Sequence, residues 1–230
     1  MTTTALTPTA PESHAPTQHG GHVDHFESPA ARRDACLLGM WVFIAQEVMF
    51  FGGLFTVYAV YRFLYHDAFV AGSRDLNLEL GTFNTFALLT SSLTMALAVN
   101  AAENDDMKKS RLFLIVTALL GTLFLVIKAI EYYHKYEHHA LPAFDLPWAN
   151  HGVHDQGIKL FISIYLAMTG LHALHMVIGI GLLAYFIWQV GKPHFWNHRS
   201  SSIDVLGLYW HLVDLVWIFL FPLLYLIDRS

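Results

Sequence analysis

Five long blocks of apolar residues constrain the fold of this chain more than any other feature. A helix that crosses a hydrocarbon core of about 30 Å needs about 20 apolar residues, because each residue advances it by about 1.5 Å. The five blocks reach that length, and 55% of the 230 residues are hydrophobic whereas 13% are charged. We therefore predict an all-α membrane protein, a bundle of five transmembrane helices at about 35–61, 80–101, 112–133, 158–190 and 205–227.

The first 30 residues have a different composition, rich in Thr, Pro, Ala, Gly and His, with no hydrophobic periodicity. Such a segment buries too little apolar surface to fold, so we expect a disordered polar tail at 1–30, followed by a membrane domain at 31–230. The tail lacks the regions of a secretory signal peptide and is expected to stay on the mature protein. We interpret its histidines as solvated rather than as metal ligands: His14, His19, His22 and His25.

The distribution of Lys and Arg predicts the orientation of the bundle. The side of the N-terminus carries Arg32, Arg33, Lys108, Lys109, Arg111, Lys192 and Arg199. The opposite side carries Arg62, Arg74, Lys135, Lys159 and Arg229. Because cytoplasmic loops are enriched in positive residues, we expect a cytoplasmic N-terminus and an outer C-terminus.

Cysteine usage and charge exclude several classes of protein. A single cysteine, Cys36, rules out an intrachain disulfide, a Cys-x-x-Cys-His haem attachment and a thiolate-pair metal centre. The net charge is −5 and no basic stripe with interleaved aromatics is present, so we expect no nucleic-acid partner.

Glu47 is an acid where the lipid should disfavour one. It lies about a dozen residues, hence about 18 Å, into the first span, close to the bilayer midplane. We expect it to be neutral or hydrogen-bonded inside the bundle, within reach of His172 or His175, which share one face of the fourth span. A proton-linked acid and a purely structural interhelical hydrogen bond both fit this pattern.

Two further pairs of ionisable residues have the same i, i+3 spacing. His211 and Asp214 lie in the last span, where we expect the imidazole to donate to the carboxylate as a structural pair. Lys128 and Glu131 form a pair near the outer end of the third span. Each group thus has a polar neighbour nearby in sequence.

Small polar residues mark the second span as a packing helix. Asn84 and Ser91 are seven residues apart, as are Thr85 and Ser92, so they share a face on which hydroxyls and amides can bond a neighbouring helix. On the fourth span the helix-packing candidates are Gly170 and Gly179.

Three intramembrane histidines and several carboxylates could in principle bind a metal, and two histidines on facing helices could ligate a haem. Because each group has its own polar neighbour, we expect interhelical hydrogen bonding instead, with no metal and no catalytic residue in this chain.

Several segments resemble subunit III of the cytochrome c and quinol oxidases. The strongest is 209–217, Tyr-Trp-His-Leu-Val-Asp-Leu-Val-Trp, which is similar to the family signature Tyr-Trp-His-Phe-Val-Asp-Val-Val-Trp. Segment 169–175, followed by Ile178 and Gly179, looks like the family's Thr-Gly-Phe-His-Gly-Leu-His helix. Further matches, in family order across about 30–228, are Glu47 with Phe50-Phe51, Asn84-Thr85 with Leu88, Leu89, Ser91 and Ser92, and Glu131-Tyr132.

The resemblance implies a non-catalytic subunit of a respiratory haem–copper oxidase in a bacterial cytoplasmic membrane, where oxygen reduction is coupled to proton pumping. It implies direct contact with subunit I, which holds haem and copper, and association with subunit II. Subunit IV and a respiratory supercomplex are further candidate partners. This chain would bind structural phospholipid, stabilise the catalytic subunit, support proton uptake and preserve activity over many turnovers.

Two departures from the family pattern are visible. The family's long form has seven helices, with a lipid-filled cleft between the first two and the remaining five, whereas this chain begins at what would be the third. The cleft is then missing or is completed by a neighbouring subunit. In addition, Gln46 stands where the family commonly has Ser, before Glu47.

Other functions fit parts of the sequence. Within the family, the chain could serve a nitric oxide reductase or a quinol oxidase. Outside it, a small membrane cytochrome b could use two of His172, His175 and His211 as haem ligands, and a Soret band would reveal it. An independent proton transporter is a third class, and co-purifying proteins would distinguish it.

Overall fold

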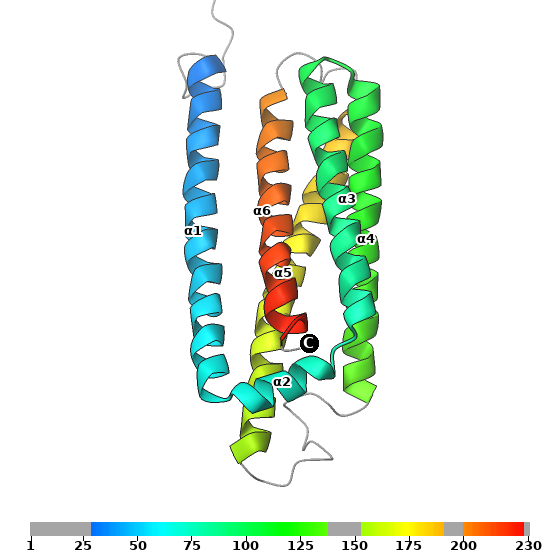
Figure 1. The fold of residues 1–230 in the computed structure, drawn as a ribbon. Coiled ribbons are helices and arrows are strands. Elements are labelled where there is room, and N and C mark those ends of the chain that lie inside the picture. The colour runs from blue at the N-terminus through cyan, green and yellow to red at the C-terminus, as the bar shows by residue number, and fades with distance from the viewer. Residues whose placement is uncertain (1–28, 138–152, 191–199, 228–230) are drawn as a thin grey trace, which may run out of the picture.

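Six α-helices make up nearly all of the computed structural model, which describes residues 29–137, 153–190 and 200–227. They are α1 (Pro29–Leu64), α2 (His66–Arg74), α3 (Leu78–Glu103), α4 (Met107–Glu137), α5 (Val153–Val190) and α6 (Ser200–Tyr225). No strand occurs within these described ranges. The predicted all-α class is confirmed (Figure 1).

Five of the helices are long and apolar enough to cross a membrane, as predicted. These spans are Asp34–Leu64, Leu78–Glu103, Met107–Glu137, Gln156–Val190 and Ile203–Tyr225. Most run a few residues beyond the predicted ends, because a helix continues to satisfy its backbone hydrogen bonds after its side chains become polar. Most of the predicted tail, 1–28, lies outside the described residues.

The short helix α2 was not predicted. Its buried residues, Ala68, Phe69, Gly72 and Ser73, form one face against the bundle. The ring of Phe69 packs edge-on against Tyr58 of α1 and Phe161 of α5, with centroids 5.6 and 5.3 Å away. A nine-residue amphipathic helix inside a polar connection has too few turns to give a clear periodic signal.

Side-chain caps fix the two turns that flank α3. Asn77 begins the helix, its Oδ1 accepting hydrogen bonds from the backbone N–H groups of Glu79 and Leu80 at 3.1 and 3.3 Å. After α3, Asp105 turns the chain with a positive φ of 58°, and Asp106 Oδ1 accepts from the backbone N–H of Lys109 at 3.2 Å. Hydrogen bonding to Lys109 holds the pKa of Asp106 below its usual value.

Helix α6 is the most enclosed of the spans and α1 the least. In Figure 1, α6 lies between α1 and the α3–α4 pair, and α2 crosses beneath it. Two fully buried tryptophans, Trp210 and Trp217, lie seven residues apart on α6 and fill the centre of the bundle. Gly121 of α4 and Gly179 of α5 leave room for the indole of Trp210.

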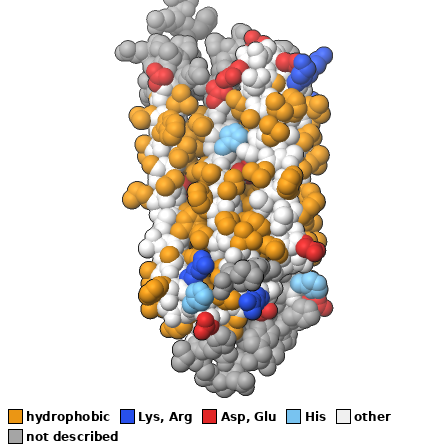
Figure 2. Space-filling model, in the orientation of Figure 1, with side chains coloured by type: hydrophobic (Ala, Val, Ile, Leu, Met, Phe, Trp, Pro, Cys, Tyr) orange, Lys and Arg blue, Asp and Glu red, His pale blue; other side chains and the backbone are white. Residues whose placement is uncertain are grey.

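The surface agrees with a membrane setting. Figure 2 shows hydrophobic side chains covering the middle of the molecule, with most of the visible charged side chains near its two ends. Large apolar residues such as Met49, Phe63 and Phe86 are exposed, which costs nothing in contact with lipid tails.

Replacing Gly121 with Ala should destabilise the bundle. The added Cβ would lie 2.7 Å from the Trp210 ring, which is buried on all sides and cannot move away. Overpacking of this kind costs about 1–3 kcal/mol. The measurement is the thermal midpoint of the purified protein. Gly170→Ala is the control, because its Cβ would meet nothing within 4 Å and should leave the midpoint unchanged or higher. Equal effects of both changes would contradict this packing.

Candidate functional site

Glu47 and His175 form a close pair between α1 and α5. Glu47 is buried, and its Oε2 lies 3.2 Å from Nε2 of His175. The structure therefore places Glu47 within reach of His175, one of the two histidines that the sequence predicted as its neighbour. The two atoms are at ion-pair distance, although their geometry is not that of a hydrogen bond, since Oε2 has no hydrogen-bond partner among the described residues. The neighbouring Gln46 is exposed on the outer side of α1, away from this contact.

The other ring nitrogen of His175 limits where protons can be. Nδ1 lies 2.8 Å from the backbone carbonyl of Leu171, and a carbonyl can only accept, so Nδ1 carries a hydrogen. In a neutral imidazole Nε2 is then the nitrogen that accepts, and it faces the Glu47 carboxyl group. The pair therefore places a proton-accepting nitrogen beside an acid.

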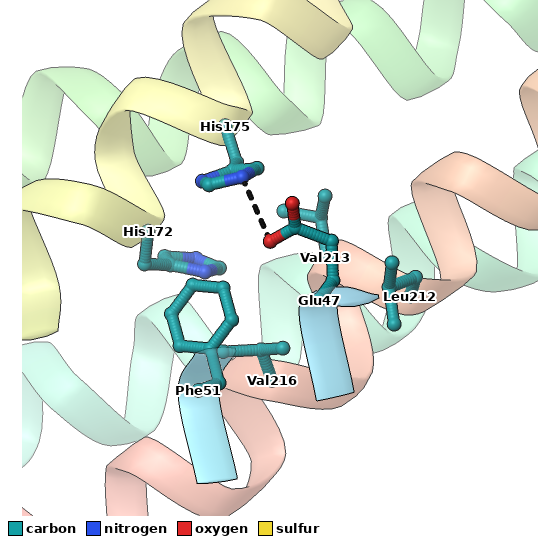
Figure 3. Close-up of a pocket in the computed structure, with 7 residues that line it drawn as sticks. All are labelled: Glu47, Phe51, His172, His175, Leu212, Val213 and Val216. Carbon is teal, nitrogen blue, oxygen red and sulfur yellow. Dashed lines mark ion pairs between the residues drawn. The ribbon is translucent and has the colours of Figure 1, made fainter. Parts of the chain in front are cut away.

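His172 lies one turn from His175 in the same pocket (Figure 3). Its ring packs against Phe124 and Trp217, with centroids 5.4 and 5.2 Å away, and only 1% of the residue is exposed. Neither ring nitrogen has a hydrogen-bond partner among the described residues. The pocket is lined by Glu47, Phe51, His172, His175, Leu212, Val213 and Val216.

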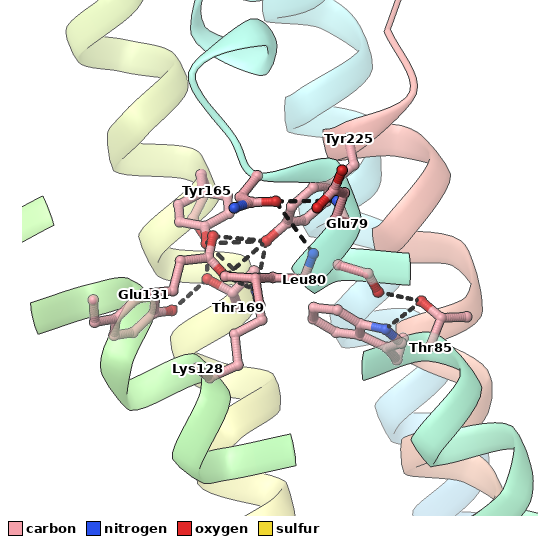
Figure 4. Close-up of polar contacts among 12 residues, drawn as sticks. Glu79, Leu80, Thr85, Lys128, Glu131, Tyr165, Thr169 and Tyr225 are labelled. Carbon is pink, nitrogen blue, oxygen red and sulfur yellow. Dashed lines mark hydrogen bonds and ion pairs between the residues drawn. The ribbon is translucent and has the colours of Figure 1, made fainter. Parts of the chain in front are cut away.

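A second buried site ties α4 to α5 and α6. Lys128 Nζ donates to Glu131 Oε2 at 2.9 Å and to the Tyr225 hydroxyl at 2.5 Å. The hydroxyls of Tyr165 and Tyr225 donate to Glu131 Oε1 at 2.6 and 2.9 Å (Figure 4). The Lys128 ammonium also lies 4.7 Å from the centre of the Trp217 ring, a favourable cation–π distance. The predicted Lys128–Glu131 pair is present, and both its charges are compensated.

The two tyrosines of this network were missed in the sequence. Tyr165 and Tyr225 lie near span ends, where tyrosine usually marks the membrane interface, so their type alone did not indicate buried partners. The Lys–Glu pair inside a span was the signal that could have indicated these tyrosines. The carboxylate of a buried ion pair needs further hydrogen-bond donors. A related contact joins the Tyr132 hydroxyl to Thr169 Oγ1, which in turn donates to the Tyr165 carbonyl at 2.6 Å.

The expected His211–Asp214 pair is wrong. Nδ1 of His211 instead lies 2.8 Å from Ser92 Oγ, and Asp214 Oδ2 accepts from Ser91 Oγ at 3.5 Å. Both partners lie on α3. The i, i+3 spacing does put His211 and Asp214 on similar faces of α6. Serines of the neighbouring helix α3 contact each of them instead.

The polar face of α3 does pack against α6. Trp210 Nε1 donates to Ser91 Oγ, and Trp217 Nε1 donates to Thr85 Oγ1, both at 3.1 Å. Asn84 is fully buried, but neither its side-chain nitrogen nor its oxygen has a hydrogen-bond partner among the described residues. Three of the four predicted polar residues therefore bond across this interface.

The two predicted packing glycines of α5 behave differently. A Cβ at Gly179 would lie 3.0 Å from the Trp210 ring, so a larger residue would press on this buried indole. At Gly170 a Cβ would meet nothing within 4 Å, so the close packing expected there within this chain is not found.

Within the described ranges, no three His, Cys, Asp or Glu side chains come together as a metal site would require. His138, His139 and His151 of the α4–α5 connection lie outside these ranges, as do the tail histidines. The described residues place an acid beside an imidazole at Glu47–His175 and compensate the buried charges around Lys128.

Comparisons with known proteins identify a single family. The family model "Cytochrome c oxidase subunit III" matches residues 19–228. "Cytochrome c oxidase subunit 3" of Thermostichus vulcanus is 32% identical over 209 residues, covering 90% of this chain and 93% of the relative. Its Synechocystis counterpart is 30% identical over 230 residues, covering 99% and 88%. "Heme-copper oxidase subunit I+III" of Aeropyrum pernix is 30% identical over 215 residues, covering 90% of this chain and 24% of that protein.

Glu131→Gln should strongly destabilise the bundle. It would leave the Lys128 ammonium, 3% exposed, without its counter-ion, and breaking a buried ion pair costs about 3–5 kcal/mol. We expect a lower thermal midpoint and less assembled protein in membranes. Adding Lys128→Met should restore part of the loss, because no charge is then stranded.

The control is Lys109→Gln, which removes the exposed pair of Lys109 with Asp106, whose Nζ and Oδ2 atoms lie 2.7 Å apart. Solvent screens that pair, so no measurable change is expected. A double variant no more stable than Glu131→Gln would show that charge compensation is not what the network provides.

Proposed function

The chain belongs to the cytochrome c oxidase subunit III family, and we propose that it braces the catalytic subunit of a bacterial haem–copper oxidase, binds phospholipid and supports proton uptake. It is a multi-pass membrane protein and a part of the oxidase complex. In this proposal it is non-catalytic, with haem and copper held by the partner subunit. The bacterial cytoplasmic membrane is its proposed location, with the N-terminus on the cytoplasmic side.

The observation that carries the bracing role is the buried network around Lys128 and Glu131. It joins three helices through charge-assisted hydrogen bonds, which are shorter and stronger than neutral ones. A scaffold fixed in this way can present an unchanging surface to a neighbour. This supports a role for the subunit in keeping the oxidase intact during turnover.

The proposed direct partner is oxidase subunit I. Subunit III proteins work with subunit I, and the Aeropyrum pernix relative is named "subunit I+III", so both parts occur there in one chain. We extend the proposal to subunit II, and to subunit IV and a respiratory supercomplex as further partners. Cytochrome c and a quinol both fit as the electron donor of such a complex.

Support for proton uptake comes from two groups of residues. Glu47 and His175 lie 3.2 Å apart inside the bundle, and in this proposal a proton passes between them. At the α3–α4 turn, on the side proposed as cytoplasmic, Glu103 and Asp105 are exposed and can collect protons or order water. These acids would raise the local proton concentration near the catalytic subunit without carrying electrons.

Removing this chain from the complex should slow the oxidase at high pH and shorten its active life. Electron transfer should persist, because haem and copper belong to the partner, whereas proton supply is most limiting where protons are scarce. The measurement is oxygen consumption by the complex with and without the subunit, over many turnovers and across pH.

Adding the purified subunit back is the control and should restore durable turnover. Immediate loss of all activity at every pH, with the partner folded and its haem spectrum intact, would show that this chain supplies an indispensable catalytic part. Unchanged rate and lifetime would also contradict the proposal.

A further inference from the structure

One exposed polar side chain in the middle of a span has no partner among the described residues. Gln46 lies on the outer side of α1, three residues before Met49, the central residue of the span Asp34–Leu64. It is therefore about 5 Å from the middle of that span. Its amide carries two N–H donors and an oxygen acceptor, and no hydrogen bond joins them to a described residue. Lipid tails offer these groups nothing, so their exposure is strongly unfavourable.

The exposed serine and threonine hydroxyls of the spans are satisfied within their own helices. Each donates to the backbone carbonyl four residues earlier, at 2.7–2.8 Å. They are Thr56, Thr82, Thr90, Thr122 and Ser163. The resemblance described above gives Ser at position 46 in the family, and a serine can make this local bond. Gln46 makes no such bond, so it needs a partner from outside the described bundle.

The backbone on either side of Gln46 is open to a neighbouring helix. Gly39 and Gly53 lie seven residues before and after it, hence on the same face of α1, and both are exposed. A Cβ at either glycine would meet nothing within 4 Å. Figure 1 shows α1 at the edge of the bundle, and α1 is the least enclosed of the spans. Glycines of this kind let two membrane helices approach closely.

We propose that this face of α1, centred on Gln46, docks a transmembrane helix of oxidase subunit I that presents a hydrogen-bonding side chain near the midplane. The inference rests on the proposed function, which makes subunit I the direct partner of this chain. Polar complementarity carries it, because a hydrogen bond between helices satisfies an amide that lipid leaves unpaired. The inner side of α1 packs on α5 through Glu47 and Phe51, so α1 lies between the bundle and its partner.

Two other occupants suit this face less well. A phospholipid carries its polar groups at the membrane surface, about 15 Å from the midplane, so it cannot bond the amide. A second copy of this chain could pair its own Gln46 with this one across a twofold axis. Subunit I is preferred to a second copy, because the proposed function requires contact between this chain and that subunit.

Photo-crosslinking in native membranes identifies the occupant directly. Replacing Gln46 with photoreactive benzoylphenylalanine, with the whole complex present, should join this chain to subunit I in an adduct that mass spectrometry identifies. The matched control is Leu119, which is 64% exposed and lies three residues before the centre of the span Met107–Glu137. The same replacement there should give much less of this adduct. An adduct with a second copy or with lipid alone, or equal yields of the subunit I adduct at both positions, would overturn the proposal.

Two variants measure what this face contributes to binding. Gln46→Leu removes the amide, and losing one interhelical hydrogen bond should weaken binding of subunit I by about threefold. Gly53→Leu should weaken it at least as much, because the added side chain holds the two helices apart. The measurement is the amount of subunit I that the tagged chain retains in mild detergent. Insertion of the chain into membranes should not change, since both positions are exposed.

Gly181→Leu is the matched control for Gly53→Leu. Gly181 is also exposed, and its Cβ would also meet nothing within 4 Å, but it lies on α5. This variant should bind subunit I as the native chain does. Unchanged binding in both α1 variants, or an equal loss in all three, would overturn this inference and leave the proposed function standing. A native chain that retains no subunit I at all would overturn both.

Discussion

The absence of water from the hydrocarbon core determines the structure of this protein. Backbone groups cannot be solvated there, so each span must be a helix, and side-chain polar groups must find partners on neighbouring helices. Lys128 is the clearest case, since Glu131, Tyr165 and Tyr225 surround an ammonium that lipid would exclude. The tryptophans of α6 follow the same rule, each placing its indole N–H on a hydroxyl of α3.

The two buried polar sites satisfy this constraint in different ways. Around Lys128 every charge has several fixed partners, so there is little freedom for a proton to move. At Glu47 the carboxyl group lies beside one imidazole, His175, whose other nitrogen bonds a backbone carbonyl. A single acid–imidazole contact is held by fewer interactions than a network of compensated charges. The first fits the proton-linked role proposed above, and the second fits structural support.

Sequence patterns predicted features that depend on one helix better than those that depend on two. The five spans follow from length and hydropathy alone, and the polar face of α3 follows from seven-residue spacing. The partners of His211 and Asp214 could not be predicted, because spacing shows which face a residue occupies but not which helix lies opposite. The contact between Glu47 and His175 could be predicted, because few other hydrogen-bond donors exist at that depth of the bundle. Helix α2 depends on packing against Tyr58 and Phe161, and Phe161 is far from it in sequence.

Polar residues are therefore more informative than apolar ones about how this chain works. Exposed apolar side chains such as Met49 and Phe63 would mark an interface in water, but in lipid they are as well solvated as in a protein contact. A buried carboxyl or imidazole is costly in the same setting and persists only where packing or chemistry compensates for it. Glu47, His172 and Asn84 each retain buried side-chain atoms without a hydrogen-bond partner among the described residues. These polar groups, rather than the broad apolar surface, are the features of the chain that folding alone explains least.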